Sequence, residues 1–140
     1  MTDSSNKSSE AASILIVDGD VVSRHVISDY LRHCGYNVVE AAGTSEAMMA
    51  LKAPSLSLDV IVCDVEAIGN LAGSELENWV REHRPELEVR MASTLENVAG
   101  TAVDLCKSRP HSTRNYGPEA VLSYITHLRA AAANHQPVGS

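Results

Sequence analysis

The segment LDVIVCD, residues 58–64, decides the fold, because an apolar run that ends in an acid is typical of a strand buried in a parallel sheet. The segment ILIVDGD, residues 14–20, repeats the pattern near the N-terminus. Neighbouring parallel strands end at the same edge of a sheet, where open α/β sheets bind ligands. The sequence therefore predicts an acidic pocket that contains Asp18 and Asp64. Carboxylate oxygens there suit a hard divalent cation, and with it a phosphoryl group.

Predicted strands and helices alternate along the chain between residues 12 and 131. Apolar runs and apolar faces of helical spacing predict strands at 13–17, 36–41, 58–63 and 88–92, and helices at 21–34, 45–52, 75–84, 94–106 and from 118 onward. This alternation with short loops indicates an α/β fold. We predict a flavodoxin-like, doubly wound, five-stranded parallel sheet of order 2-1-3-4-5 with five helices. Its fifth strand, in the polar stretch 107–117, is expected to be degraded. That order places the first and third strands side by side.

Capping residues predict where several helices begin and end. Thr44 or Ser45 is expected to cap the second helix, and Ser74 the third. Gly35 is a fitting stop for the first helix, since glycine readily adopts the conformation that follows a helix. Pro118 suits the first turn of the last helix.

The composition of the 140 residues predicts a single domain at 12–131, with disordered tails at 1–11 and 132–140. A net charge of −7 argues against nucleic acid and anionic membranes as partners. The first ten residues lack the apolar region of a secretory signal, and no apolar run reaches the ~20 residues of a membrane span. We therefore expect a cytoplasmic protein.

The three cysteines show no C-x-x-C spacing, so the sequence does not indicate a zinc site. Cys34 and Cys63 lie in apolar-rich segments, and we expect both to be core residues rather than reactive thiols.

The order and spacing of these segments resemble the receiver domain of two-component response regulators, a CheY-like domain, over about residues 12–130. SILIVDGD at 13–20 is similar to the family's first strand and acidic cluster, and DYLRHCGY at 29–36 to the end of its first helix. VEAA at 39–42 is similar to the second strand. DVEAIGNLAG at 64–73 resembles the phosphoacceptor loop, and YGPEAVL at 116–122 resembles the start of the last helix.

The resemblance implies a phosphorylated signalling domain, with no enzyme activity beyond its own phosphorylation and dephosphorylation. In this family a histidine kinase or a phosphotransfer protein donates a phosphoryl group to the aspartate that ends the third strand, which is Asp64 here. The family also implies Mg²⁺, which offsets charge between the carboxylate and the phosphoryl oxygens. The implied metal ligands are Asp18, Asp64 and the main-chain carbonyl of Glu66, with Asp20 as a further candidate.

Several positions depart from the family pattern. Gly19 stands where the family has its second, metal-binding acid, so we expect a weakened or rebuilt Mg²⁺ site. Ala92 aligns with the Thr or Ser that binds the phosphoryl group, and Ser93 follows one residue later. Arg114 aligns with the lysine that pairs with the phosphoryl oxygens, and it keeps the charge without the compact ammonium geometry. His111 aligns with the aromatic switch position.

Plain structural roles compete with functional ones at four of these positions. Asp20 suits a helix N-cap as well as a metal ligand. Glu66 is either a solvated loop acid or a ligand through its side chain. His111 is either an exposed loop residue or a gate, and Tyr116 belongs either to the packed interior or to a partner-binding surface.

Three functions therefore compete. The first is a stand-alone receiver in a phosphorelay, impaired in phosphorylation, which acts through protein–protein contacts around residues 93–125, with homodimerisation left open. The second is a pseudo-receiver, an interaction module that works without phosphorylation. The third is a haloacid-dehalogenase-like phosphatase, because DGDVV at 18–22 fits a D-x-D-x-V pattern with Asp18 as nucleophile and Asp20 as general acid.

Overall fold

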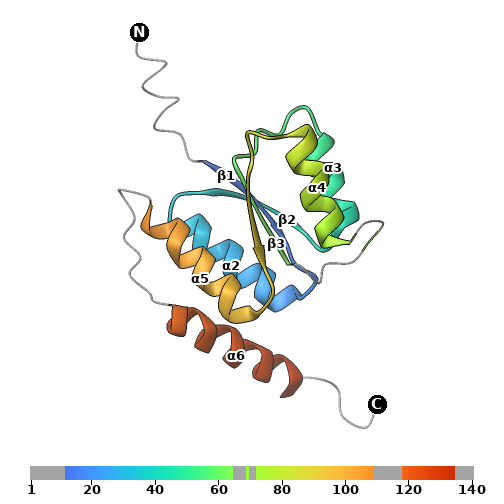
Figure 1. Ribbon diagram of the computed structural model, residues 1–140. Coiled ribbons are helices and arrows are strands. Elements are labelled where there is room, and N and C mark those ends of the chain that lie inside the picture. The colour runs from blue at the N-terminus through green and yellow to red at the C-terminus, as the bar shows by residue number, and fades with distance from the viewer. Residues whose placement is uncertain (1–11, 65–68, 70–71, 109–117, 135–140) are drawn as a thin grey trace.

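The computed structural model describes residues 12–64, 69, 72–108 and 118–134. Their centre is a parallel sheet of order β2-β1-β3-β4, which lies between two layers of helices (Figure 1). The strands are β1 (Ser13–Val17), β2 (Asn37–Ala41), β3 (Val60–Asp64) and β4 (Glu88–Ala92). The observed order confirms the predicted flavodoxin-like arrangement, and it makes β1 and β3 direct neighbours. The predicted fifth strand falls in 107–117, of which 109–117 lie outside the described residues.

The described residues form the five expected helices, three on one face of the sheet and two on the other (Figure 1). On one face lie α2 (Val21–His33), α5 (Leu95–Lys107) and α6 (Pro118–Asn134). On the opposite face lie α3 (Thr44–Lys52) and α4 (Gly73–His83). No helix in the described part of the chain is long and apolar enough to span a membrane.

The two central strands alternate their side chains between the two helical layers, as a period of two residues requires. Ile14 and Ile16 of β1 pack with the α2, α5 and α6 side, whereas Leu15 and Val17 pack with the α3 and α4 side. β3 alternates in the same way. Because β1 and β3 are buried on both faces, the ends of these strands are held firmly in place.

The helix ends agree with some of the predicted caps. Asp20 caps α2, since the Ser23 amide donates to its Oδ2 over 3.3 Å. Gly35 follows the end of α2 with a φ of 102°, a conformation that favours glycine, and Pro118 begins α6 as expected.

Two predicted caps were wrong. α3 begins at Thr44 itself, after Gly43, so neither Thr44 nor Ser45 is its cap. α4 begins at Gly73, so Ser74 lies inside the helix. The start of α4 is instead stabilised by Glu75, whose Oε1 accepts from the Ala72 amide over 2.8 Å. The negative side chain satisfies a main-chain donor that a helix start leaves unpaired.

The cysteines show one feature that the sequence did not reveal. Cys34, at the end of α2, forms a disulfide with Cys106 in the last turn of α5, with a Cα–Cα distance of 5.4 Å. Both residues are buried, so Cys34 is a core residue, but a cross-linked one. Cys63 is buried and free, as expected. The disulfide ties together two helices of the same layer across 72 residues of chain.

Candidate functional site

The sheet brings the two predicted carboxylates to one pocket. Val17 lies in register with Cys63, so Asp18 after β1 is level with Asp64 at the end of β3. Both line a cavity of about 150 Å³, the acidic pocket. Its other lining residues come from α2, the β4–α5 connection, α5 and α6: Asp20, Ser23, Ser93, Thr94, Leu95, Val98 and Arg129. The geometry therefore agrees with the expectation that parallel strands deliver their terminal acids to one edge.

Asp18 is the buried acid of the pocket, with 7% of its surface exposed. Its Oδ1 accepts from the Asp20 amide over 2.9 Å. Burial raises the pKa of Asp18 above its usual range, and the nearby charges of Asp64 and Asp20 act in the same direction. The hydrogen bond from Asp20 and the charge of Arg24 oppose this increase without cancelling it. Negative charge at Asp18 is therefore only partly compensated by the protein.

The negative charge of Asp20 is compensated by Arg129, which comes from a distant part of the chain. Its Oδ2 accepts from the Ser23 hydroxyl over 2.6 Å and from the guanidinium of Arg129 on α6. Burial alone would raise the pKa of Asp20, but the hydrogen bonds from Ser23 and Arg129 and the charge of Arg129 outweigh it and lower the pKa. Asp20 is thus a helix cap and an ion-pair partner, whereas a role as metal ligand stays a prediction.

The end of β4 differs from the expected phosphoryl-binding arrangement. Ala92 pairs in register with Asp64, but it is buried and offers no hydroxyl. The adjacent Ser93 is exposed and lines the pocket, and its Oγ accepts from the Asn97 side chain over 3.2 Å. Thr94, which also lines the pocket, caps α5 by accepting from the Asn97 amide over 3.1 Å. The hydroxyl groups of this edge therefore come from Ser93 and Thr94.

Five of the lining residues were not predicted as site residues from the sequence: Ser23, Thr94, Leu95, Val98 and Arg129. Thr94 carried a usable signal, because a threonine directly before a predicted helix is a common N-cap. Arg129 carried none, because it is 109 residues from its partner Asp20 and follows an ordinary apolar position, Leu128, of the last helix.

Four predicted site residues lie outside the described residues: Glu66, His111, Arg114 and Tyr116. Their expected roles stay predictions. Burial, and then the charges of Asp64, Glu77 and Asp18, raise the pKa of Cys63, next to Asp64, to about 12, which favours the protonated thiol at neutral pH.

The residues of the pocket partly fit a Mg²⁺ ion. Asp18 and Asp64 are oxygen donors of the kind that Mg²⁺ prefers, and the raised pKa of Asp18 indicates charge that a cation would offset. Gly19 contributes no side-chain ligand, and Asp20 already binds Arg129. Within the described ranges, no three His, Cys, Asp or Glu side chains are arranged to hold a metal ion. Asp18 and Asp64 are therefore the candidate ligands, in an incomplete set.

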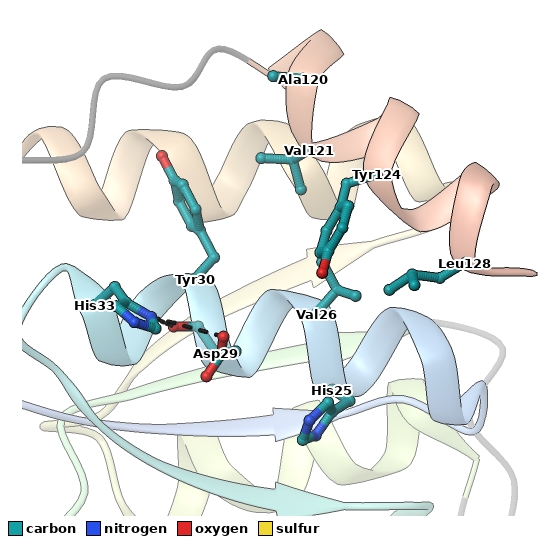
Figure 2. Close-up of a pocket in the computed structure, with 9 residues that line it drawn as sticks. All are labelled: His25, Val26, Asp29, Tyr30, His33, Ala120, Val121, Tyr124 and Leu128. Carbon is teal, nitrogen blue, oxygen red and sulfur yellow. Dashed lines mark hydrogen bonds and ion pairs between the residues drawn. The ribbon is translucent and has the colours of Figure 1, made fainter.

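A second, larger cavity of about 560 Å³ lies between α2 and α6 (Figure 2). On the α2 side the groove presents His25, Asp29 and His33, and the His33 ring lies 3.6 Å from the Asp29 carboxylate. On the α6 side the ring of Tyr124, which is 57% exposed, and the side chain of Leu128 face α2 (Figure 2). We call this cavity the α2–α6 groove. It shares α2 and α6, but no residue, with the acidic pocket.

The fold and the acid-lined pocket at the ends of β1 and β3 define a receiver domain. The family model of the response regulator receiver domain matches residues 14–108, and the chain belongs to this family. The match includes Asp18, Asp64 and Ser93, whereas Arg129 lies beyond it.

Individual relatives agree with this assignment. The two-component response regulator-like protein PRR37 from Oryza sativa subsp. indica is 29% identical over 96 residues, which are 69% of this chain and 13% of that protein. The chain thus spans a small part of the length of this curated relative.

Solved receiver structures share the fold. A CheY-like receiver from Methanospirillum hungatei JF-1 superposes with a TM-score of 0.56 at 20% identity, over 89% of this chain and 98% of the other. CheY4 of Vibrio cholerae gives a TM-score of 0.52 at 24% identity, over 84% and 98%. The response regulator TrrA in complex with the histidine kinase ThkA is another relative, with a TM-score of 0.52, 23% identity and coverage of 60% and 70%.

Proposed function

We propose that this chain is a receiver that accepts a phosphoryl group on Asp64 from a histidine kinase or a phosphotransfer protein, and that signals through protein–protein contacts. One observation carries the proposal: β1 and β3 are paired in parallel and end with Asp18 and Asp64 in one pocket. The kinase complex among the structural relatives supports the class of donor. A cytoplasmic location and a single domain at 12–131 belong to the same proposal.

The transfer itself is a substitution at phosphorus. A carboxylate oxygen of Asp64 forms the new O–P bond, the N–P bond of the donor phosphohistidine breaks, and its electron pair stays on the imidazole nitrogen. Mg²⁺ held by Asp18 and Asp64 would offset the negative charge of the carboxylate and the phosphoryl oxygens. Ser93 would donate its hydroxyl hydrogen to a phosphoryl oxygen, in place of the hydroxyl that Ala92 lacks.

The same pocket predicts slow phosphorylation. A phosphoryl group adds nearly two negative charges to a site in which the charge of Asp18 is already poorly compensated. Gly19 removes one expected metal ligand, and Ala92 removes one expected hydrogen-bond donor. We therefore expect phosphorylation that needs high Mg²⁺ concentrations.

Phosphorylation can be measured directly by mass spectrometry, or as a Phos-tag gel shift, after treatment with acetyl phosphate and Mg²⁺. The wild type is expected to gain one phosphoryl group, and Asp64→Asn none. Asp59→Asn is the matched control, because Asp59 lies at the opposite end of the same strand region, where its Oδ2 accepts from the Ser13 amide over 2.8 Å. The proposed function would be contradicted if the wild type stayed unmodified at high Mg²⁺, or if Asp64→Asn were labelled to the same extent as the wild type.

A phosphorylation-independent pseudo-receiver is the second candidate, favoured by Gly19, Ala92 and the ion pair between Arg129 and Asp20. It predicts that beryllofluoride with Mg²⁺ leaves the NMR spectrum unchanged and that Asp64→Asn has the wild-type spectrum outside the pocket. Beryllofluoride-dependent shifts along α5 and α6 would favour the phosphorylated receiver instead.

The phosphatase alternative is disfavoured by two findings. The chain belongs to the receiver family, and Asp20, the proposed general acid, has a lowered pKa and is bound by Arg129 and Ser23. An acid that holds its proton weakly is poorly suited to protonate a leaving group near neutral pH.

A further inference from the structure

We infer that Arg129 is the internal cation of the acidic pocket and that it competes with a divalent metal ion bound there. The inference rests on the proposed Mg²⁺-dependent receiver function and adds a regulating residue from the last helix. Its basis is that Arg129 lines the same small pocket as Asp18 and Asp64 and binds Asp20 there.

The contacts of Arg129 are specific to the first turn of α2. Its guanidinium donates to Oδ2 of Asp20 and to Oγ of Ser23, the latter over 2.8 Å. Ser23 is 1% exposed and itself donates to Oδ2 of Asp20, so the three side chains form a closed network. A guanidinium held by two partners keeps a defined position better than a single exposed ion pair does.

The charge balance of the pocket gives this network a consequence. Three carboxylates line the cavity, and Arg129 is the one cationic side chain among the lining residues that the structure describes. A divalent cation would occupy the same small space of about 150 Å³ and would be repelled by the guanidinium. Arg129 therefore lowers the affinity of the pocket for metal, and it also withholds Asp20 as a potential ligand.

Arg129 also connects the pocket to the α2–α6 groove. Leu128, its neighbour in the chain, lines the groove together with Tyr124 and faces Val26 of α2 (Figure 2). The same end of α6 thus lies against α2 on one side and reaches the acidic pocket on the other. A metal ion that displaces Arg129 would loosen this end of α6 and change the groove.

The test is a Mn²⁺ titration followed by electron paramagnetic resonance, with Mn²⁺ as the probe for divalent binding. Arg129→Gln is expected to bind Mn²⁺ about tenfold more tightly than the wild type. The variant loses one positive charge close to the metal, and the repulsion lost with it corresponds to a change in affinity of about this size. Arg129→Lys keeps the charge and should stay near the wild type. Arg81→Gln is the matched control, because it makes the same change in net charge on α4, where Arg81 pairs with Glu77.

A second readout is the Mg²⁺-induced change in the amide NMR signals of Tyr124 and Leu128. It should be clear in the wild type and largely absent in Arg129→Gln, in which nothing remains to be displaced. Equal Mn²⁺ affinity of Arg129→Gln and the wild type, or an equal gain in Arg81→Gln, would overturn the inference. Failure of the proposed function shows separately, as tighter metal binding by Arg129→Gln without any labelling of Asp64.

Discussion

The floor and the rim of the acidic pocket are built differently. The floor is formed by Asp18 and Asp64 at the ends of two central strands that are buried on both faces. The rim is formed by the first turn of α2, the β4–α5 connection and α6, which come from distant parts of the chain and are joined in part by the hydrogen bonds of Arg129 to Asp20 and Ser23. The floor keeps the acid expected after the first strand and the acid expected at the end of the third, whereas Gly19 and Ala92, next to the pocket lining, stand where the receiver pattern has a second acid and a hydroxyl. The sheet thus holds Asp64, the proposed acceptor, in place, whereas the groups around it depend on contacts between distant segments.

The largest effect is expected from the disulfide that joins the C-terminal ends of α2 and α5, two helices whose first turns line the pocket. A cross-link between Cys34 and Cys106 closes a loop with a sequence separation of 72 residues. Because the cross-link restricts the unfolded chain, reducing it should lower the free energy of unfolding by about 4 kcal/mol. Urea unfolding with and without a reducing agent measures this difference.

A double variant supplies the control for the disulfide. Cys34→Ala/Cys106→Ala should unfold at the same urea concentration with and without reductant, while Cys63→Ala, which alters the free buried cysteine, should keep the sensitivity of the wild type. If the wild type unfolds at the same urea concentration with and without reductant, the disulfide does not contribute to stability and the prediction is wrong.

A carboxylate at position 19 should strengthen metal binding by the pocket. A Cβ atom at Gly19 would lie 3.5 Å from the Ala42 carbonyl oxygen, an ordinary contact, so the backbone at this position accepts the first side-chain atom of Gly19→Asp. The added carboxylate should raise Mg²⁺ affinity about tenfold, because Mg²⁺ binding strengthens with each well-placed oxygen ligand.

Calorimetric titration with Mg²⁺ measures this gain. The control is Gly100→Asp, which adds the same charge on α5, where a new Cβ meets no atom within 4 Å. Equal affinity of the two variants would mean that the space at Gly19 does not open onto the metal site.

The two rim hydroxyls should separate into a structural and a chemical role. Thr94→Ala removes the α5 cap and should cost about 1 kcal/mol of unfolding free energy. Ser93→Ala should leave stability within about 0.5 kcal/mol and slow the labelling of Asp64 by acetyl phosphate. Thermal unfolding and the rate of the Phos-tag shift distinguish them. If Thr94→Ala slows labelling more than Ser93→Ala does, the assignment of Ser93 is wrong.

The smallest effect concerns the pH dependence of the floor. The pKa of Asp18 is raised in the folded protein above the ordinary value of 3.8, so the fold favours the protonated acid. The contribution of Asp18 to the stability of the folded protein is therefore fully present below pH 3.8, and it is lost as the pH rises through the raised pKa. Asp18→Asn should thus melt at a higher temperature than the wild type at pH 7, and the difference should shrink toward pH 3.

Thermal scans across this pH range supply the comparison, with Asp104→Asn on the exposed side of α5 as the reference variant. A melting difference between Asp18→Asn and the wild type that does not depend on pH would contradict a buried, poorly compensated acid at this position.

The floor could be predicted from the sequence because its signals are local. Apolar runs at 14–17 and 58–63 predict buried strands, and the rules for parallel sheets then bring their terminal acids together. The rim depends on contacts between distant segments. Nothing in the helical pattern of α6 indicates that Arg129 reaches Asp20, and nothing in the spacing of three cysteines selects Cys34 and Cys106 as partners. The predicted start of α4 was also wrong, because the Ala72 amide donates to the side chain of Glu75 and Ser74 lies inside the helix.

The contact distance at Gly19 has a consequence for the history of such a pocket. Two of the four glycine codons become aspartate codons by a single base change, and a Cβ atom at this position would meet no described atom closer than 3.5 Å. One mutation in a lineage that carries this chain could therefore place a carboxylate where the receiver pattern has its second acid.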